Sequence, residues 1–216
     1  AKLPEQPKRT IKPEQGAMAD LPQSLPSSDA STKASTPSHT ILILPGLGNS
    51  GVGHWQTHWE AMLPNVVRVQ QQEWDAPQRS AWVVALNTAL LNIDGTVILV
   101  AHSLGCALVA WWGMEYGHAA HANKIVGALL VAPADVGQAD FPEAATGFSP
   151  MPRLRLPFKS MVVASSDDPW CALPKAKSFA ADWHAQFVSM GANGHINAQS
   201  NLGDWPQGRE YLATLA

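Results

Sequence analysis

Short, wholly apolar runs that alternate with longer segments of helical period are the feature that most restricts what this chain can fold into. The runs are rich in β-branched residues, which is typical of strands buried on both faces of a parallel sheet. They predict strands at Thr40–Leu44, Val66–Gln70, Thr96–Ala101, Ile125–Val131, Ser160–Ala164 and Gln186–Met190. The segments between them predict helices at His54–Leu63, Arg79–Ile93, Leu104–Tyr116, Lys175–His184 and Gln207–Leu215. The expected fold class is α/β, a doubly wound, mostly parallel sheet of about six strands with helices on both faces.

Residues 1–38 differ in composition from the rest of the chain, being rich in Pro, Ser, Thr and Lys and poor in apolar residues. Such a segment buries too little surface to offset its ordering entropy, so we expect a disordered tail. It is either a mere extension or a docking segment for a protein partner. Residues 39–216 are expected to form the α/β domain, with residues 134–159, which contain four prolines, as a short lid.

Charge and composition exclude several classes of function. A net charge of −3 without any basic block argues against binding to nucleic acid or to an anionic membrane, and favours small neutral substrates. The two cysteines, Cys106 and Cys171, adjoin apolar stretches and are interpreted as buried free thiols. The sequence has neither an apolar run of about 18 residues nor a signal-peptide core, so we expect a cytoplasmic protein.

The segment Ala101-His102-Ser103-Leu104-Gly105 joins a predicted strand to a predicted helix through a tight turn. A nucleophile elbow of the Gly-x-Ser-x-Gly type has this arrangement, with small residues two positions before and after the serine. Ala101 departs from the usual glycine but is small. Ser103 is therefore the candidate nucleophile, and the alternative is that it only caps the helix. His102 is interpreted as a supporting or core histidine.

Two backbone N–H groups are candidates for an oxyanion hole. One belongs to Leu104, at the start of the helix, where the helix dipole favours negative charge. The other is expected from the glycine-rich loop at residues 45–51, through Leu47. This loop also resembles a phosphate loop, but it lacks both the Lys-Ser/Thr ending and the spacing of a dinucleotide site.

A candidate acid and a candidate base follow the serine in the chain order that this fold uses. Asp167 and Asp168 come directly after one predicted strand, and His195 lies in a glycine-bearing loop after the last one. We favour Asp168 as the carboxylate that orients His195, while Asp167 is the alternative, because either residue could instead cap the turn before Pro169.

Other histidines and tryptophans carry weaker signals. His54 and His58 are spaced for metal binding on one helix face, but Trp55 stands where a zinc protease has its glutamate, so no metal and no cofactor are expected. Trp55 and Trp170 follow the predicted oxyanion loop and the predicted acid. We expect them to wall an apolar acyl pocket, although core packing explains most tryptophans.

Taken together, residues from about Thr40 to Leu215 resemble the small serine hydrolases of the retinoblastoma-binding-protein-9-like family and its bacterial members. The resemblance rests on Leu44-Pro45-Gly46, Gly53-His54-Trp55, Ala101-His102-Ser103-Leu104-Gly105, Asp167-Asp168-Pro169, Gly194-His195-Ile196-Asn197 and Gly203-Asp204-Trp205. It implies an α/β-hydrolase core with a minimal cap, a Ser103–His195–Asp168 triad and hydrolysis of a small-molecule ester or amide. In the family pattern the acid directly precedes the proline, which supports Asp168. The alternative is a protein-interaction module that keeps the hydrolase scaffold with little or no catalysis.

Overall fold

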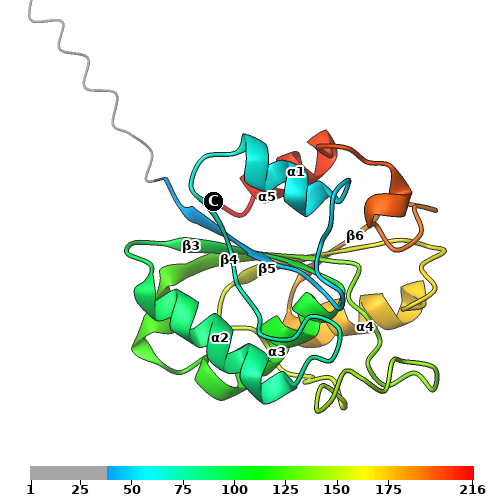
Figure 1. Ribbon diagram of the computed structural model, residues 1–216, viewed down its shortest axis with the longest axis horizontal. Coiled ribbons are helices and arrows are strands. Elements are labelled where there is room, and N and C mark those ends of the chain that lie inside the picture. Colours follow the sequence, from blue (N-terminus) through cyan, green and yellow to red (C-terminus); the bar gives the residue numbers. More distant parts are fainter. Residues whose placement is uncertain (1–37) are drawn as a thin grey trace, which may run out of the picture. The chain divides into compact units, whose positions relative to one another are not determined.

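Six parallel strands form the centre of the structure, a computed structural model that describes residues 38–216 (Figure 1). The strand order is β2-β1-β3-β4-β5-β6, and every neighbouring pair is parallel. The strands are β1 (Thr40–Leu44), β2 (Val66–Arg68), β3 (Val97–His102), β4 (Ile125–Val131), β5 (Lys159–Ala164) and β6 (Gln186–Ser189). All six predicted strands are confirmed, whereas the prediction of a disordered tail lies outside the described residues except for Ser38.

Helices cover both faces of this sheet, as predicted. Figure 1 shows α1 (Trp55–Met62) and α5 (Pro206–Ala213) on one face, and α2 (Arg79–Asn92), α3 (Leu104–Tyr116) and α4 (Leu173–Trp183) on the other. Two short 3-10 helices, η1 (Ala120–Lys124) and η2 (Ala198–Ser200), lie in connections. The helix α4 begins two residues before the predicted Lys175, because Pro174 in the first turn is compatible with a helix start. No helix within residues 38–216 has the length and apolarity needed to cross a membrane.

The strand β3 shows why the apolar runs are continuous. All six of its residues are buried. Val97, Leu99 and Ala101 belong to the core cluster that includes residues of α2, α3 and α4, whereas Ile98 and Val100 belong to the cluster that contains α1 and α5 residues. Successive side chains of a strand point to opposite faces, so a strand covered on both faces needs apolar residues at every position.

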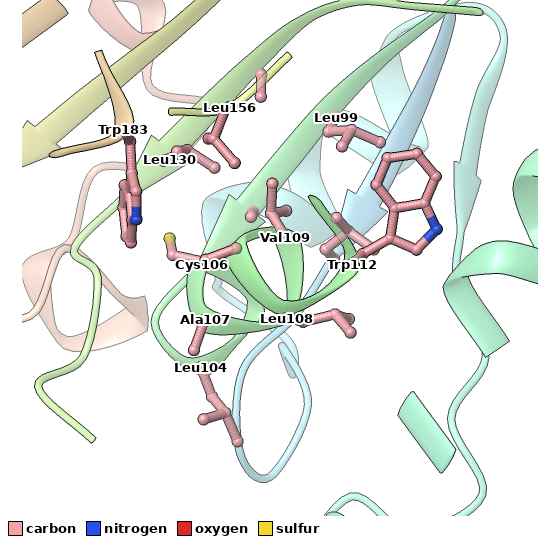
Figure 2. Close-up of a cluster of buried hydrophobic side chains, with 14 of the residues drawn as sticks. Leu99, Leu104, Cys106, Ala107, Leu108, Val109, Trp112, Leu130, Leu156 and Trp183 are labelled. Carbon is pink, nitrogen blue, oxygen red and sulfur yellow. The ribbon is translucent and has the colours of Figure 1, made fainter. Parts of the chain in front are cut away.

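The helix α3, which follows the elbow, is buried on nearly all sides. Figure 2 shows its side chains packed against those of β3, β4, α4 and the segment before β5, which contribute Leu99, Leu130, Trp183 and Leu156. A helix that is apolar all round belongs in a core. Cys106 lies in this cluster and Cys171 is also buried; both thiols are free, and burial raises their pKa, that of Cys171 to about 12.

Residues 132–158, between β4 and β5, contain no regular helix or strand. Indole N–H groups hold this segment to the helices beneath it, because Trp111 donates to the carbonyl of Phe148 at 2.8 Å and Trp183 donates to that of Pro152 at 2.9 Å. The segment is therefore anchored to α3 and α4, and it adds no separate cap domain.

The order of the strands sets where a ligand can bind. The chain passes from β1 outward to β2, then returns to β3 and continues outward on the other side to β6. Loops that leave neighbouring strands in opposite directions open a crevice at the carboxyl ends of those strands. In this sheet the crevice lies between β1 and β3.

Candidate active site

The turn between β3 and α3 places Ser103 at the crevice. Its backbone has a φ of 55° and a ψ of −120°, a strained conformation that L-residues rarely adopt, and its N–H donates to the carbonyl of Val131 at 3.0 Å. Although Ser103 occupies the N-cap position of α3, its side chain makes no capping hydrogen bond. The hydroxyl is thus directed elsewhere, and the capping alternative does not describe its contacts.

Small residues around the elbow allow the backbones to approach closely. A Cβ at Gly105 would lie 2.3 Å from the carbonyl oxygen of Leu44, and a Cβ at Gly46 would lie 2.8 Å from the Cβ of Ser103. Ala101 is completely buried in the core, so its methyl group fits where glycine is usual. The requirement at Gly46 was not foreseen from the sequence; its place in the loop after β1 was the only signal.

Ser103, His195 and Asp168 form one hydrogen-bonded chain. The hydroxyl of Ser103 lies 2.8 Å from Nε2 of His195, and Nδ1 of His195 lies 2.8 and 2.9 Å from the two carboxylate oxygens of Asp168. An ionised carboxylate only accepts, so Nδ1 carries the proton and Nε2 is free to accept from the serine. These three residues, brought together from loops after β3, β5 and β6, are the ones predicted from the sequence.

The neighbouring carboxylate, Asp167, makes different contacts. Its Oδ1 accepts from the hydroxyl of Ser165 at 2.7 Å and from the N–H of Gly194 at 2.8 Å, and these hydrogen bonds lower the pKa of Asp167. Asp168, by contrast, also accepts from the N–H of Trp170 at 2.9 Å, which fixes its carboxylate. Asp167 therefore ties the acid loop to the backbone of the histidine loop, while Asp168 contacts the imidazole.

Two further histidines lie on one side of the site, and one of them, His102, contacts His195. Nε2 of His102 donates to the backbone carbonyl of His195 at 2.9 Å, and the ring of His54 lies 4.7 Å from that of His102. Burial is the main cause that lowers the pKa of His54, to about 3, and that of His102 well below its usual value. Nδ1 of His54 accepts from the N–H of Gln56 at 3.1 Å, so the neutral ring carries its proton on Nε2.

The predicted oxyanion donors lie beside the serine. Leu47 and Leu104 both line the cavity that contains Ser103, and neither N–H donates a hydrogen bond to another residue between 38 and 216. The loop after β1 lies close to the elbow: a Cβ added at Gly46 would be 3.2 Å from the backbone nitrogen of Leu104. Both donors are thus free to bind a ligand oxygen.

A cavity of about 360 Å³ opens above Ser103. Trp170 is part of its wall, as predicted, but the prediction for Trp55 is wrong. Trp55 is only 1% exposed, and its indole N–H donates to the carbonyl of Ile196 at 2.8 Å beneath the site. The lining comprises Gly46, Leu47, Asn49, Gly51, His54, His102, Ser103, Leu104, Ala134, Phe141, Pro142, Trp170, His195, Asn197, Ala198 and Gln199.

Several of these lining residues were not foreseen. Phe141 and Pro142 come from the expected lid, whose individual residues had no distinguishing pattern, and residues 197–199 simply follow His195 in the chain. The sequence marks His54 as a possible metal ligand and as part of the Gly53-His54-Trp55 motif, but it does not indicate a place in the cavity. His54 caps α1 and is buried whereas His58 is exposed, and within residues 38–216 no three potential ligand side chains of the His, Cys, Asp or Glu type come together.

Comparisons with known proteins identify the family and the fold of the chain. The sequence model of the serine hydrolase family matches residues 41–214. A putative YdeN-like hydrolase from Pectobacterium atrosepticum is 30% identical, with a TM-score of 0.70 over 82% of this chain and 89% of that one. The ydeN gene product of Bacillus subtilis is 18% identical, with a TM-score of 0.61 over 82% and 98% of the two chains. No curated protein was found to match.

A third solved structure extends the similarity of fold. An α/β serine hydrolase homologue from Coxiella burnetii is 16% identical and has a TM-score of 0.57, over 82% of this chain and 85% of that one. The family match spans the strands that carry Ser103, Asp168 and His195. The chain belongs to the serine hydrolase family, and its fold is that of the α/β-hydrolases.

Proposed function

We propose that this protein hydrolyses an ester, or an amide, of a small uncharged acyl group through a covalent acyl-enzyme on Ser103. The observation that carries the proposal is the unbroken chain of hydrogen bonds from Asp168 through His195 to the Ser103 hydroxyl. A scaffold without catalysis has no physical need for these three groups in this order. The resemblance to the retinoblastoma-binding-protein-9-like branch stays part of this proposal.

In the first half of the reaction, the Ser103 oxygen attacks the substrate carbonyl while Nε2 of His195 takes the hydroxyl proton. Asp168 keeps the proton of the neutral ring on Nδ1 and stabilises the imidazolium that forms. His195 then gives the proton to the leaving group, and the carbon–leaving-group bond breaks. In the second half, water adds to the acyl-enzyme by the same route and Ser103 is restored.

The negative charge that develops on the carbonyl oxygen needs donors in place before the reaction. The N–H groups of Leu104 and Leu47 supply them, supported by their position beside Ser103 and their lack of acceptors within residues 38–216. A single such donor contributes roughly 100-fold or more in rate.

The cavity restricts the acyl group. Leu47, Phe141, Pro142 and Trp170 supply an apolar wall, and no Asp, Glu, Lys or Arg is among the cavity-lining residues of the described chain. Transfer of an ionised group into such a site is costly without a partner. We therefore expect short or aromatic uncharged acyl groups to react faster than charged ones of the same length.

Labelling with a fluorophosphonate tests the nucleophile directly, because this reagent phosphonylates a serine that a general base activates. Wild-type protein should be labelled and should hydrolyse p-nitrophenyl butyrate, whereas Ser103→Ala should do neither. Ser189→Ala, which removes an exposed serine in β6, is the matched control and should behave as wild type. Equal labelling of wild type and Ser103→Ala would refute the proposal.

A further inference from the structure

A second cavity adjoins the one that contains Ser103. It has a volume of about 420 Å³ and shares Trp170, His195, Asn197 and Gln199 with the first cavity. Ser103 itself does not line it. The two cavities therefore meet at the candidate base, and a substrate held at Ser103 can extend past His195 into the second one.

The lining of the second cavity is polar but uncharged. Side chains of Asn193, Asn197, Gln199 and Ser200 contribute amides and a hydroxyl, and no Asp, Glu, Lys or Arg lines it among the described residues. Nδ2 of Asn197 and the side-chain amide of Gln199 have no hydrogen-bond partner within residues 38–216. Both amides are thus available to a ligand.

The proposed reaction decides which part of the substrate occupies this cavity. Nε2 of His195 receives the proton of Ser103 and must pass it to the leaving group, so the leaving group lies on the side of His195. The acyl part lies against the apolar wall of the first cavity. We infer that the second cavity is the leaving-group subsite and that it accepts an uncharged, hydroxyl-rich alcohol.

The chemistry of the lining favours hydroxyl groups over other ligands. An amide side chain offers both donors and an acceptor, which matches a hydroxyl that both donates and accepts. A phosphate or a carboxylate would call for a Lys or Arg partner, and an ammonium for an Asp or Glu partner; the lining contributed by residues 38–216 has none of these four. Trp170 adds an aromatic surface for the carbon skeleton.

The same subsite should also admit an acyl acceptor, because acylation and deacylation follow the same path in opposite directions. The acceptor hydroxyl gives its proton to Nε2 of His195, and its oxygen forms a bond to the acyl carbon. The bond from that carbon to the Ser103 oxygen breaks, and the serine oxygen regains the proton from His195. The products are a new ester and free enzyme, with no further reactant.

Three butyrate esters test the inference, which rests on the proposed function. The 2,3-dihydroxypropyl ester carries two hydroxyls, the 2,3-dimethoxypropyl ester keeps the electron-withdrawing oxygens without O–H donors, and p-nitrophenyl butyrate reports basal activity. We expect wild type to have a kcat/KM about five- to tenfold higher for the dihydroxypropyl than for the dimethoxypropyl ester, as one or two hydrogen bonds would give. Added glycerol should also yield glyceryl butyrate from the p-nitrophenyl ester.

The variant Gln199→Leu should bring this ratio of kcat/KM values close to one and should reduce the yield of glyceryl butyrate. Gln207→Leu changes an exposed glutamine in α5, outside both cavities, and should keep the wild-type ratio. Equal kcat/KM values for the two esters in wild type, or a ratio that survives in Gln199→Leu, would overturn the subsite. Failure of wild type to hydrolyse p-nitrophenyl butyrate would instead count against the proposed function.

Discussion

At the scale of single residues, His195 is held at three points. Asp168 accepts from Nδ1, Ser103 lies at Nε2, and His102 binds the backbone carbonyl. The side chain of Asp168 is 2% exposed and that of His195 is 10% exposed, so water competes little for these hydrogen bonds. In a site that is shielded from water, each of these contacts restricts the orientation of the imidazole.

The two adjacent carboxylates should respond differently to substitution. Asp168→Asn replaces the carboxylate that accepts from Nδ1 of His195, and the new amide favours the wrong tautomer of the imidazole. We therefore expect kcat to fall by about a thousandfold or more, as on replacement of a triad acid. Asp167→Asn keeps a side-chain oxygen for Gly194 and should cost less than about tenfold. Steady-state hydrolysis of p-nitrophenyl butyrate measures both, and the reverse ranking would transfer the role to Asp167.

His102 is expected to act as a positioning residue through the carbonyl of His195. The variant His102→Gln retains a side-chain donor near the position of Nε2, whereas His102→Met removes the donor at similar side-chain length. We expect His102→Met to lower kcat by about tenfold, in keeping with loss of one hydrogen bond, and His102→Gln to restore most of that loss. The decisive measurement compares kcat, KM and the pH profile of the two variants; equal kcat values would show that the hydrogen bond is unimportant.

At the scale of elements, the position of Ser103 depends on how closely α3 approaches β1. Gly105 brings the first turn of α3 against the carbonyl oxygens of Leu44 and Pro45, and Gly46 lets the following loop pass the serine. The buried side chains of α3 then fix the helix against the sheet (Figure 2). The packing of α3 and of the loop after β1 therefore holds Ser103 in its strained backbone conformation.

Adding one methyl group tests this packing. Gly105→Ala would place its Cβ 2.3 Å from a backbone oxygen, so α3 must shift, and overpacking of this kind costs about 1–3 kcal/mol of unfolding free energy. The melting temperature should fall by about 3–10 °C. Gly51→Ala is the control, since its Cβ would meet no atom within 4 Å. Equal thermal unfolding of the two variants would contradict the packing argument.

The elements themselves could be predicted from the sequence because burial on both faces leaves a clear pattern. The strand β3 is apolar at five successive positions, from Val97 to Ala101, and Ser103 is the second residue after this run. The edge strand β2 was expected to reach Gln70 but ends at Arg68, since its partner β1 pairs with it only from Ile41 to Ile43. The end of an edge strand depends on its neighbour, which local sequence does not reveal.

At the scale of the whole molecule, the outcome for tryptophans shows what the pattern of residues leaves undetermined. Trp55 and Trp170 each follow a predicted catalytic loop, yet only Trp170 reaches the cavity. Trp55 packs against Trp59 and Trp205, with ring centroids 4.8 and 4.9 Å apart. Trp55 is in the core because α1 packs against the C-terminal segment. This contact joins distant parts of the chain, so the local sequence does not predict it.

Two buried neutral histidines should make the stability of the molecule depend on pH. The pKa of His54 is lowered to about 3, mainly by burial and then by Arg68, and burial also lowers that of His102. In the unfolded chain both have ordinary pKa values near about 6.5. Below about pH 6.5 the unfolded chain gains protons that the folded protein does not, so stability is lost as the pH falls. The slope is roughly 1–1.5 kcal/mol per pH unit for His54, and His102 adds to the loss in the same direction.

Urea unfolding at pH 7 and pH 5 measures this loss. The variant His54→Asn keeps an N-cap acceptor for Gln56 but removes the titrating ring, so its stability should fall clearly less than that of wild type between the two pH values. Two results would contradict a role of His54 in this pH dependence. One is a wild-type urea midpoint that is the same at pH 5 as at pH 7, and the other is a His54→Asn variant that loses as much stability as wild type.

The strand order has a consequence for the chain during its synthesis. Ser103 leaves the ribosome 92 residues before His195. His195 follows the edge strand β6, and its neighbour Ile196 accepts a hydrogen bond from the indole N–H of Trp55. A nascent chain thus carries an elbow without its base until nearly all of the domain has emerged. Growing chains should therefore be inert, and reactivity toward a fluorophosphonate reports that the last strand has joined the sheet.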